Sequence, residues 1–178
     1  MIWPFTKKWF DLRRVRAIED KLIARLKAQE KDMRRIIREI NLTIKVIGRH
    51  PKDPMEGGFL AGAHIENAVE RTSAIYNELK AMKKLEDIEI NEFVKAMKKD
   101  LGTDENKKFA KALEIEEDIR DDTLNLEKLL MQTIAHIRET GARGYLSNFL
   151  YVLKEHMEKH LSTTEKEVER MKKKRAAA

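Results

Sequence analysis

The stretch that decides the fold is residues 11–48, DLRRVRAIEDKLIARLKAQEKDMRRIIREINLTIKVIG. It contains no proline, and its one glycine is the last residue, Gly48. Apolar residues recur at steps of three and four, as Leu12, Val15, Leu22, Leu26, Met33, Ile36, Ile40 and Ile47. This period is that of an amphipathic helix with one buried face. We therefore predict a helix of about 38 residues, roughly 57 Å long.

Three further helical segments follow, because a few glycines divide the rest of the chain into long runs with the same apolar period. We expect them to extend from about residue 59 to Gly102, from Thr103 to Gly141, and from about Gly144 into the basic C-terminal residues. The apolar period fades in LEDIEI, residues 85–90. This predicts a kink or a short break in the second helix near Asp87.

Four long helices joined by short turns are typical of an antiparallel up-down-up-down arrangement, so the predicted fold is an all-α four-helix bundle. Near-heptad spacing leaves an elongated coiled-coil dimer as the alternative, and homo-oligomerisation stays open. We expect residues 1–10 to be an aromatic and basic N-terminal arm and residues 11–175 to form a single bundle domain. The three alanines 176–178 are predicted to be a vector-derived tail.

The composition excludes several classes of protein function. Charged residues make up 38% of the 178 residues, as in helices with a charged surface. The absence of cysteine excludes disulfides, thiolate metal ligands and cysteine nucleophiles. No phosphate-binding glycine loop or nucleophile elbow is found, so we expect neither an enzyme nor a cofactor. Without a long apolar run or a signal peptide the chain is predicted to be cytoplasmic, and abundant Lys and Glu beside scarce Gln favour a heat-adapted source.

Aromatic and basic residues gather at the start of the chain, where MIWPFTKKWF holds both tryptophans. An antiparallel bundle brings both termini to one end. The residues of this predicted basic end are Trp3, Phe5, Lys7, Lys8, Trp9, Phe10, Arg13, Arg14, Arg16, Lys172, Lys173 and Lys174. Aromatic rings beside cations are typical of a segment that docks on an anionic membrane surface. The alternatives are an arm packed on its own bundle, an acidic protein partner and a nucleic acid.

Inward-facing histidines and glutamates form the second candidate site. His156 and His160 are four residues apart on one helix face, a spacing that can chelate one metal ion. Glu19 and Glu116 fall on the apolar seams of other helices. This set resembles the inward carboxylates and histidines of di-iron carboxylate bundles. It departs from them because none of the five histidines follows a glutamate by three residues.

The acidic run EIEEDIRDD, residues 114–122, is interpreted as a solvated helix face. The leading expectation is therefore a non-enzymatic helical interaction or scaffold protein, peripheral at the inner face of a membrane, whose basic end docks on an anionic surface. The alternative is a Glu/His metal-binding bundle with redox or hydrolytic activity.

Overall fold

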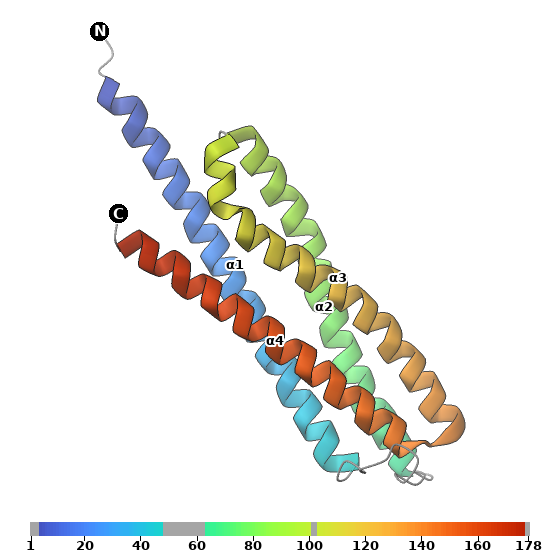
Figure 1. Cartoon of the computed structure of the whole chain (residues 1–178). Coiled ribbons are helices and arrows are strands. Elements are labelled where there is room, and N and C mark those ends of the chain that lie inside the picture. The colour runs from blue at the N-terminus through green and yellow to red at the C-terminus, as the bar shows by residue number, and fades with distance from the viewer. Residues whose placement is uncertain (1–3, 48–62, 101–102, 177–178) are drawn as a thin grey trace.

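The computed structural model of the chain is built from four α-helices (Figure 1). They are α1 (Pro4–Ile47), α2 (Ala63–Asp100), α3 (Thr103–Thr140) and α4 (Arg143–Ala176). The structure describes residues 4–47, 63–100 and 103–176, and within them the side chains of residues 13–47, 64–82 and 109–176. The prediction of an all-α fold is confirmed.

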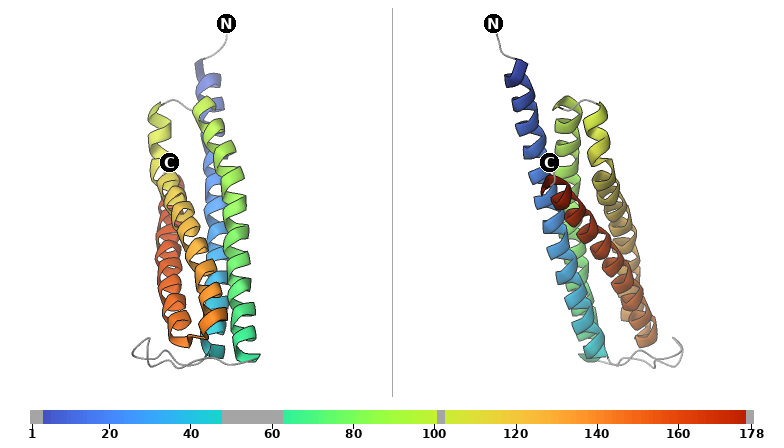
Figure 2. Two further views of the ribbon diagram at one scale, coloured as in Figure 1. Left: turned by 90° about the vertical axis from the view of Figure 1, so that its right-hand side faces the viewer. Right: turned by 60° about the vertical axis from the view of Figure 1, so that its left-hand side comes forward.

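The helices form an antiparallel bundle (Figure 2). Helix α1 packs against α2 and α4, and α3 packs against the same two helices. Consecutive helices run in opposite directions (Figure 1). Helices α1 and α3 lie diagonally across the bundle, because each of them packs against both α2 and α4. The start of α1 and the end of α4 lie toward one end of the bundle, together with the end of α2 and the start of α3. This confirms the predicted up-down-up-down fold.

Two helix bounds differ from the sequence prediction. Helix α1 begins at Pro4 instead of residue 11. Proline is favoured at the first helical position, where its missing N–H has no intrahelical partner to lose. Helix α2 continues without interruption through Asp87, so the predicted short break is absent. Residues 85–90 contain neither glycine nor proline, and the faded apolar period alone does not break the backbone hydrogen bonding.

Gly141 ends α3 and starts the turn into α4. Its φ is +66°, in the left-handed region that only glycine enters without a steric cost. Its amide N donates a hydrogen bond to the carbonyl oxygen of Ile137 at 2.8 Å. Thr140 Oγ1 donates to the carbonyl oxygen of His136 at 2.8 Å and accepts from the amide N of Ala142 at 3.2 Å. The C-terminus of α3 is therefore capped by local hydrogen bonds.

Replacing Gly141 with alanine should lower the free energy of unfolding by about 1–2 kcal/mol, because a Cβ atom is strained at this φ. Equilibrium denaturation in urea measures the change. Gly141→Asn is the matched control, since asparagine tolerates the left-handed region and should cost less than alanine. Equal stability of the wild type and Gly141→Ala would contradict the inference that the backbone conformation at residue 141 requires glycine.

The buried apolar side chains form two clusters along the bundle. The larger cluster includes Met33, Ile40, Ile119, Leu130 and Leu150, all fully buried. The smaller cluster lies nearer the chain termini and consists of Leu22, Ile23, Leu26, Phe109, Ala112, Val168 and Met171. The core is therefore divided along the helix axes.

Polar side chains occupy the interior between these clusters on three helices. They form what we call the polar layer: Arg25, Gln29, Glu116, Thr164 and Glu167. The side chain of Glu116 is only 1% exposed, and both of its carboxylate oxygens lie 2.7 Å from Arg25 Nε. Because α1 and α3 are diagonal neighbours, this ion pair crosses the bundle interior.

Candidate functional site

The basic end of the bundle is shaped by the projection of α1. Its first turns extend past the end of α2 and the start of α3, and far past the C-terminus of α4 (Figures 1 and 2). Residues 4–10 belong to this helix and include Phe5, Lys7, Lys8, Trp9 and Phe10. The side chains of these five residues, and the whole of Trp3, lie outside the described part of the structure.

The described cations of the basic end are exposed. This holds for Arg13, Arg14 and Arg16 of α1 and for Lys172, Lys173 and Lys174 of α4.

The end of α4 is tied to α1 by an ion pair. Arg175 pairs with Asp20, so the C-terminal lysines lie beside the part of α1 around Asp20. Lys172 Nζ donates to Glu169 at 2.8 Å, and this bond, with the positive charge, lowers the pKa of the Glu169 carboxyl below its ordinary value. The start of α1 extends about 24 Å beyond Asp20. The basic residues therefore spread along α1 and do not form a flat cap.

A hollow of about 570 Å³ lies between α1 and the end of α4. Its lining residues are Asp20, Ile23, Lys27, Lys172, Arg175 and Ala176. Its cations are Lys27, Lys172 and Arg175, of which Arg175 pairs with Asp20 and Lys172 with Glu169. An anionic group such as a phosphate would compete with these carboxylates for the three cations.

The four predicted metal ligands separate into two groups. His156 and His160 lie together on α4, as their spacing predicts. Glu116 lies in the polar layer, where Arg25 holds its carboxylate. Glu19 is partly buried on α1 and is not part of the histidine cluster. The structure therefore brings the two histidines together and leaves both glutamates elsewhere.

Asp122 of α3 joins the two histidines. His160 Nε2 lies 2.7 Å from Asp122 Oδ2, and His156 Nδ1 lies 3.8 Å from the same oxygen. One ligand atom from each of the three residues lies within 4.8 Å of the other two. His160 is buried, with 9% of its surface exposed, whereas the His156 side chain is 45% exposed. We call these three residues the Asp–His cluster.

The Asp–His cluster borders a hollow of about 200 Å³ between α3 and α4. Its lining residues are Ile115, Asp118, Asp121, Asp122, Lys159, His160 and Thr163. Three carboxylates therefore face one lysine around this hollow. The acidic run, interpreted from sequence as a solvated face, supplies all three of these carboxylates.

Asp122 was not singled out as a ligand from the sequence, although one signal points to it. Asp122 and His160 lie equally far along the chain from Gly141, the residue that starts the turn between α3 and α4. In an antiparallel hairpin, residues equally distant from the turn lie side by side. Counting outward from Gly141 therefore pairs these two residues.

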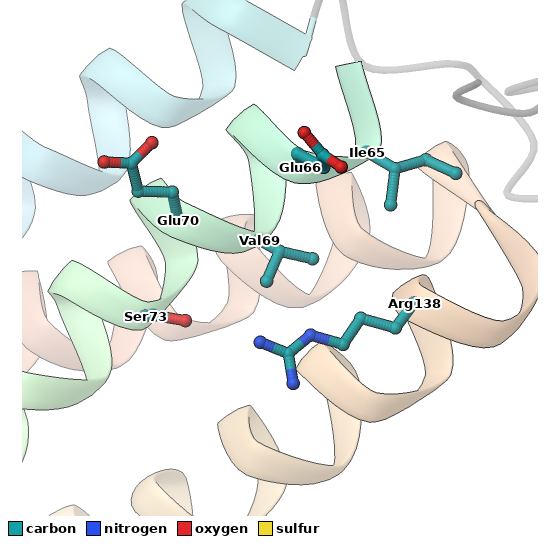
Figure 3. Close-up of a pocket in the computed structure, with 6 residues that line it drawn as sticks. All are labelled: Ile65, Glu66, Val69, Glu70, Ser73 and Arg138. Atoms are coloured by element: carbon teal, nitrogen blue, oxygen red, sulfur yellow. The ribbon is translucent and has the colours of Figure 1, made fainter. Parts of the chain in front are cut away.

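Another hollow, of about 390 Å³, lies between α2 and α3 (Figure 3). Its lining residues are Ile65, Glu66, Val69, Glu70, Ser73 and Arg138. Arg138 extends from α3 toward the side chains of Val69 and Ser73 on α2. None of these six residues belongs to the predicted basic end or to the Asp–His cluster.

Within the described residues, no helix has an apolar stretch that would reach across a bilayer. The chain matches no protein-family model, and no curated protein or solved structure is significantly similar to it.

Proposed function

We propose that the protein is a non-enzymatic helical scaffold that docks on an anionic membrane surface through its basic end. The observation that carries this proposal is the projection of α1 past the other helices (Figure 1). The projecting turns belong to the segment of sequence that is richest in aromatic and basic residues. A projecting helix of this composition can reach the headgroup region while the bundle stays in water.

Electrostatic attraction would also turn the basic end of the bundle toward an anionic membrane. Each Lys or Arg near an anionic surface contributes about 1 kcal/mol, and the contribution falls off within a Debye length. Arg13, Arg14 and Arg16 continue the positive charge along α1. The hollow that contains Lys27, Lys172 and Arg175 offers a place for one lipid phosphate beside this helix.

Binding to vesicles tests the proposal. We expect the full chain to co-sediment with phosphatidylcholine vesicles that contain phosphatidylglycerol, and not with phosphatidylcholine alone. Deleting residues 1–10 should weaken binding by at least about 30-fold, because it removes Lys7, Lys8 and the aromatic anchors. The double variant Lys27→Ala/Lys172→Ala should weaken it roughly 10- to 30-fold.

The matched control is Lys45→Ala/Lys128→Ala, which removes two exposed lysines outside the basic end and should bind nearly as the wild type. Tryptophan fluorescence gives a direct readout, because both indoles lie within residues 1–10 and should shift to the blue on anionic vesicles. A blue-shifted, quencher-protected signal in the free protein, with a lower melting temperature after the deletion, would show an arm packed on the bundle. Binding to RNA or to an acidic protein, with none to vesicles, would favour those partners instead.

A further inference from the structure

The donor atoms of the Asp–His cluster have the spacing of a metal site. A tetrahedral ion with bonds of about 2.0–2.1 Å holds its donor atoms roughly 3.3 Å apart. The two distances from Asp122 Oδ2, 2.7 Å to His160 Nε2 and 3.8 Å to His156 Nδ1, lie on either side of this value. All three donor atoms lie within 4.8 Å of one another, so small side-chain adjustments would bring them around one ion.

A hydrogen bond between His160 and Asp122 explains only part of the cluster. His156 is 45% exposed, yet its ring nitrogen also faces Asp122 Oδ2. The two imidazoles come from successive turns of one helix and converge on one carboxylate of another helix. This convergence from two rigid elements is what a chelating site requires.

The charge around the cluster favours a cation. Asp118 and Asp121 line the adjoining hollow together with Asp122, and Lys159 is the one cationic residue among its lining side chains. Arg120 Nε lies 3.3 Å from Asp121 Oδ1 and offsets part of this charge, and the remaining negative potential raises the local concentration of cations. A bound divalent ion would offset this clustered charge.

The donor set indicates the class of metal. Two imidazole nitrogens and one carboxylate oxygen suit borderline divalent ions such as Zn²⁺, whereas Mg²⁺ and Ca²⁺ prefer oxygen donors alone. We propose that Asp122, His156 and His160 bind one divalent transition-metal ion of the Zn²⁺ class between α3 and α4. Three protein donors leave a position for water, and the ion links the two helices. This site is separate from the basic end, so it stands or falls independently of membrane docking.

Titration of the full chain with Zn²⁺ by calorimetry tests the site. We expect one ion per chain. At a free Zn²⁺ concentration of about 100 times Kd, the melting temperature should rise by roughly 5–10 °C, because the ion binds the folded state. Co²⁺ should give the intense visible absorption of tetrahedral coordination, and Mg²⁺ should give neither effect.

Two variants identify the ligands. His156→Gln and Asp122→Asn change exposed or partly exposed side chains, so both should fold, as circular dichroism verifies. Each should weaken Zn²⁺ binding at least about tenfold and abolish the Co²⁺ spectrum. His64→Gln is the matched control, because His64 is an exposed histidine on α2, and it should bind Zn²⁺ like the wild type.

Three results would overturn the proposal. They are a wild type without one-to-one Zn²⁺ binding, unchanged affinity in both His156→Gln and Asp122→Asn, and an equal loss of affinity in His64→Gln.

Discussion

Replacing Arg25 with methionine is expected to lower the free energy of unfolding by about 3–5 kcal/mol. The substitution keeps most of the side-chain volume but removes the charge that faces Glu116. The Glu116 side chain is 1% exposed, so its carboxylate would stay buried without this cation. A buried carboxylate that loses the cation bonded to both of its oxygens costs several kcal/mol, because the interior solvates the charge poorly. Denaturation in guanidinium chloride measures the loss.

Two comparisons separate this effect from simple loss of packing. The double variant Arg25→Met/Glu116→Leu removes both charges and should recover most of the stability. Arg34→Met breaks the pair between Arg34 and Glu165, whose side chains are 62% and 38% exposed, and should cost less than about 1 kcal/mol. If Arg25→Met costs as little as Arg34→Met, the buried pair does not hold α1 and α3 together.

The second large effect is expected at Leu130 in the larger apolar cluster. Leu130 is fully buried, and Leu130→Ala should lower the free energy of unfolding by about 2–5 kcal/mol through lost burial and the cavity left behind. For a chain of this length, the melting temperature should fall by roughly 5–15 °C. Thermal unfolding followed by circular dichroism measures it.

The neighbouring residue provides the matched control. Leu129 is 48% exposed on the same helix, so Leu129→Ala makes the same chemical change outside the core and should shift stability by about 0.5 kcal/mol or less. Similar losses for the two variants would contradict the helix rotation that places Leu130 inside and Leu129 outside.

The fold was predictable because the apolar period carries most of the information about a bundle. Leu22, Leu26, Met33, Ile36 and Ile40 were assigned to the buried seam of the first helix, and all five are fully buried. The exact helix bounds were less predictable. Pro4 starts α1 although proline usually marks a break, and the faded period near Asp87 leaves α2 intact.

The candidate sites depend on which side chains of different helices contact one another. The apolar period of a single helix carries no information about these contacts. Glu116 sits on an apolar seam, and the sequence does not reveal that Arg25 of a diagonal helix reaches it. Asp122 belongs to an acidic run that has the pattern of a solvated face, although one of its oxygens meets His160. The turn at Gly141 sets the register of α3 against α4 and so pairs Asp122 with His160, whereas the pairing of Glu116 with Arg25 depends on how α1 and α3 lie across the bundle.

The polar layer has a consequence for how the bundle opens. The buried apolar side chains form separate clusters on the two sides of this layer, so we expect the smaller cluster to open without exposing the larger one. We therefore expect two cooperative units, with the less protected one nearer the termini. Backbone amides around Leu22 and Val168 would exchange with solvent through local opening, whereas those around Leu130 and Leu150 would require global unfolding.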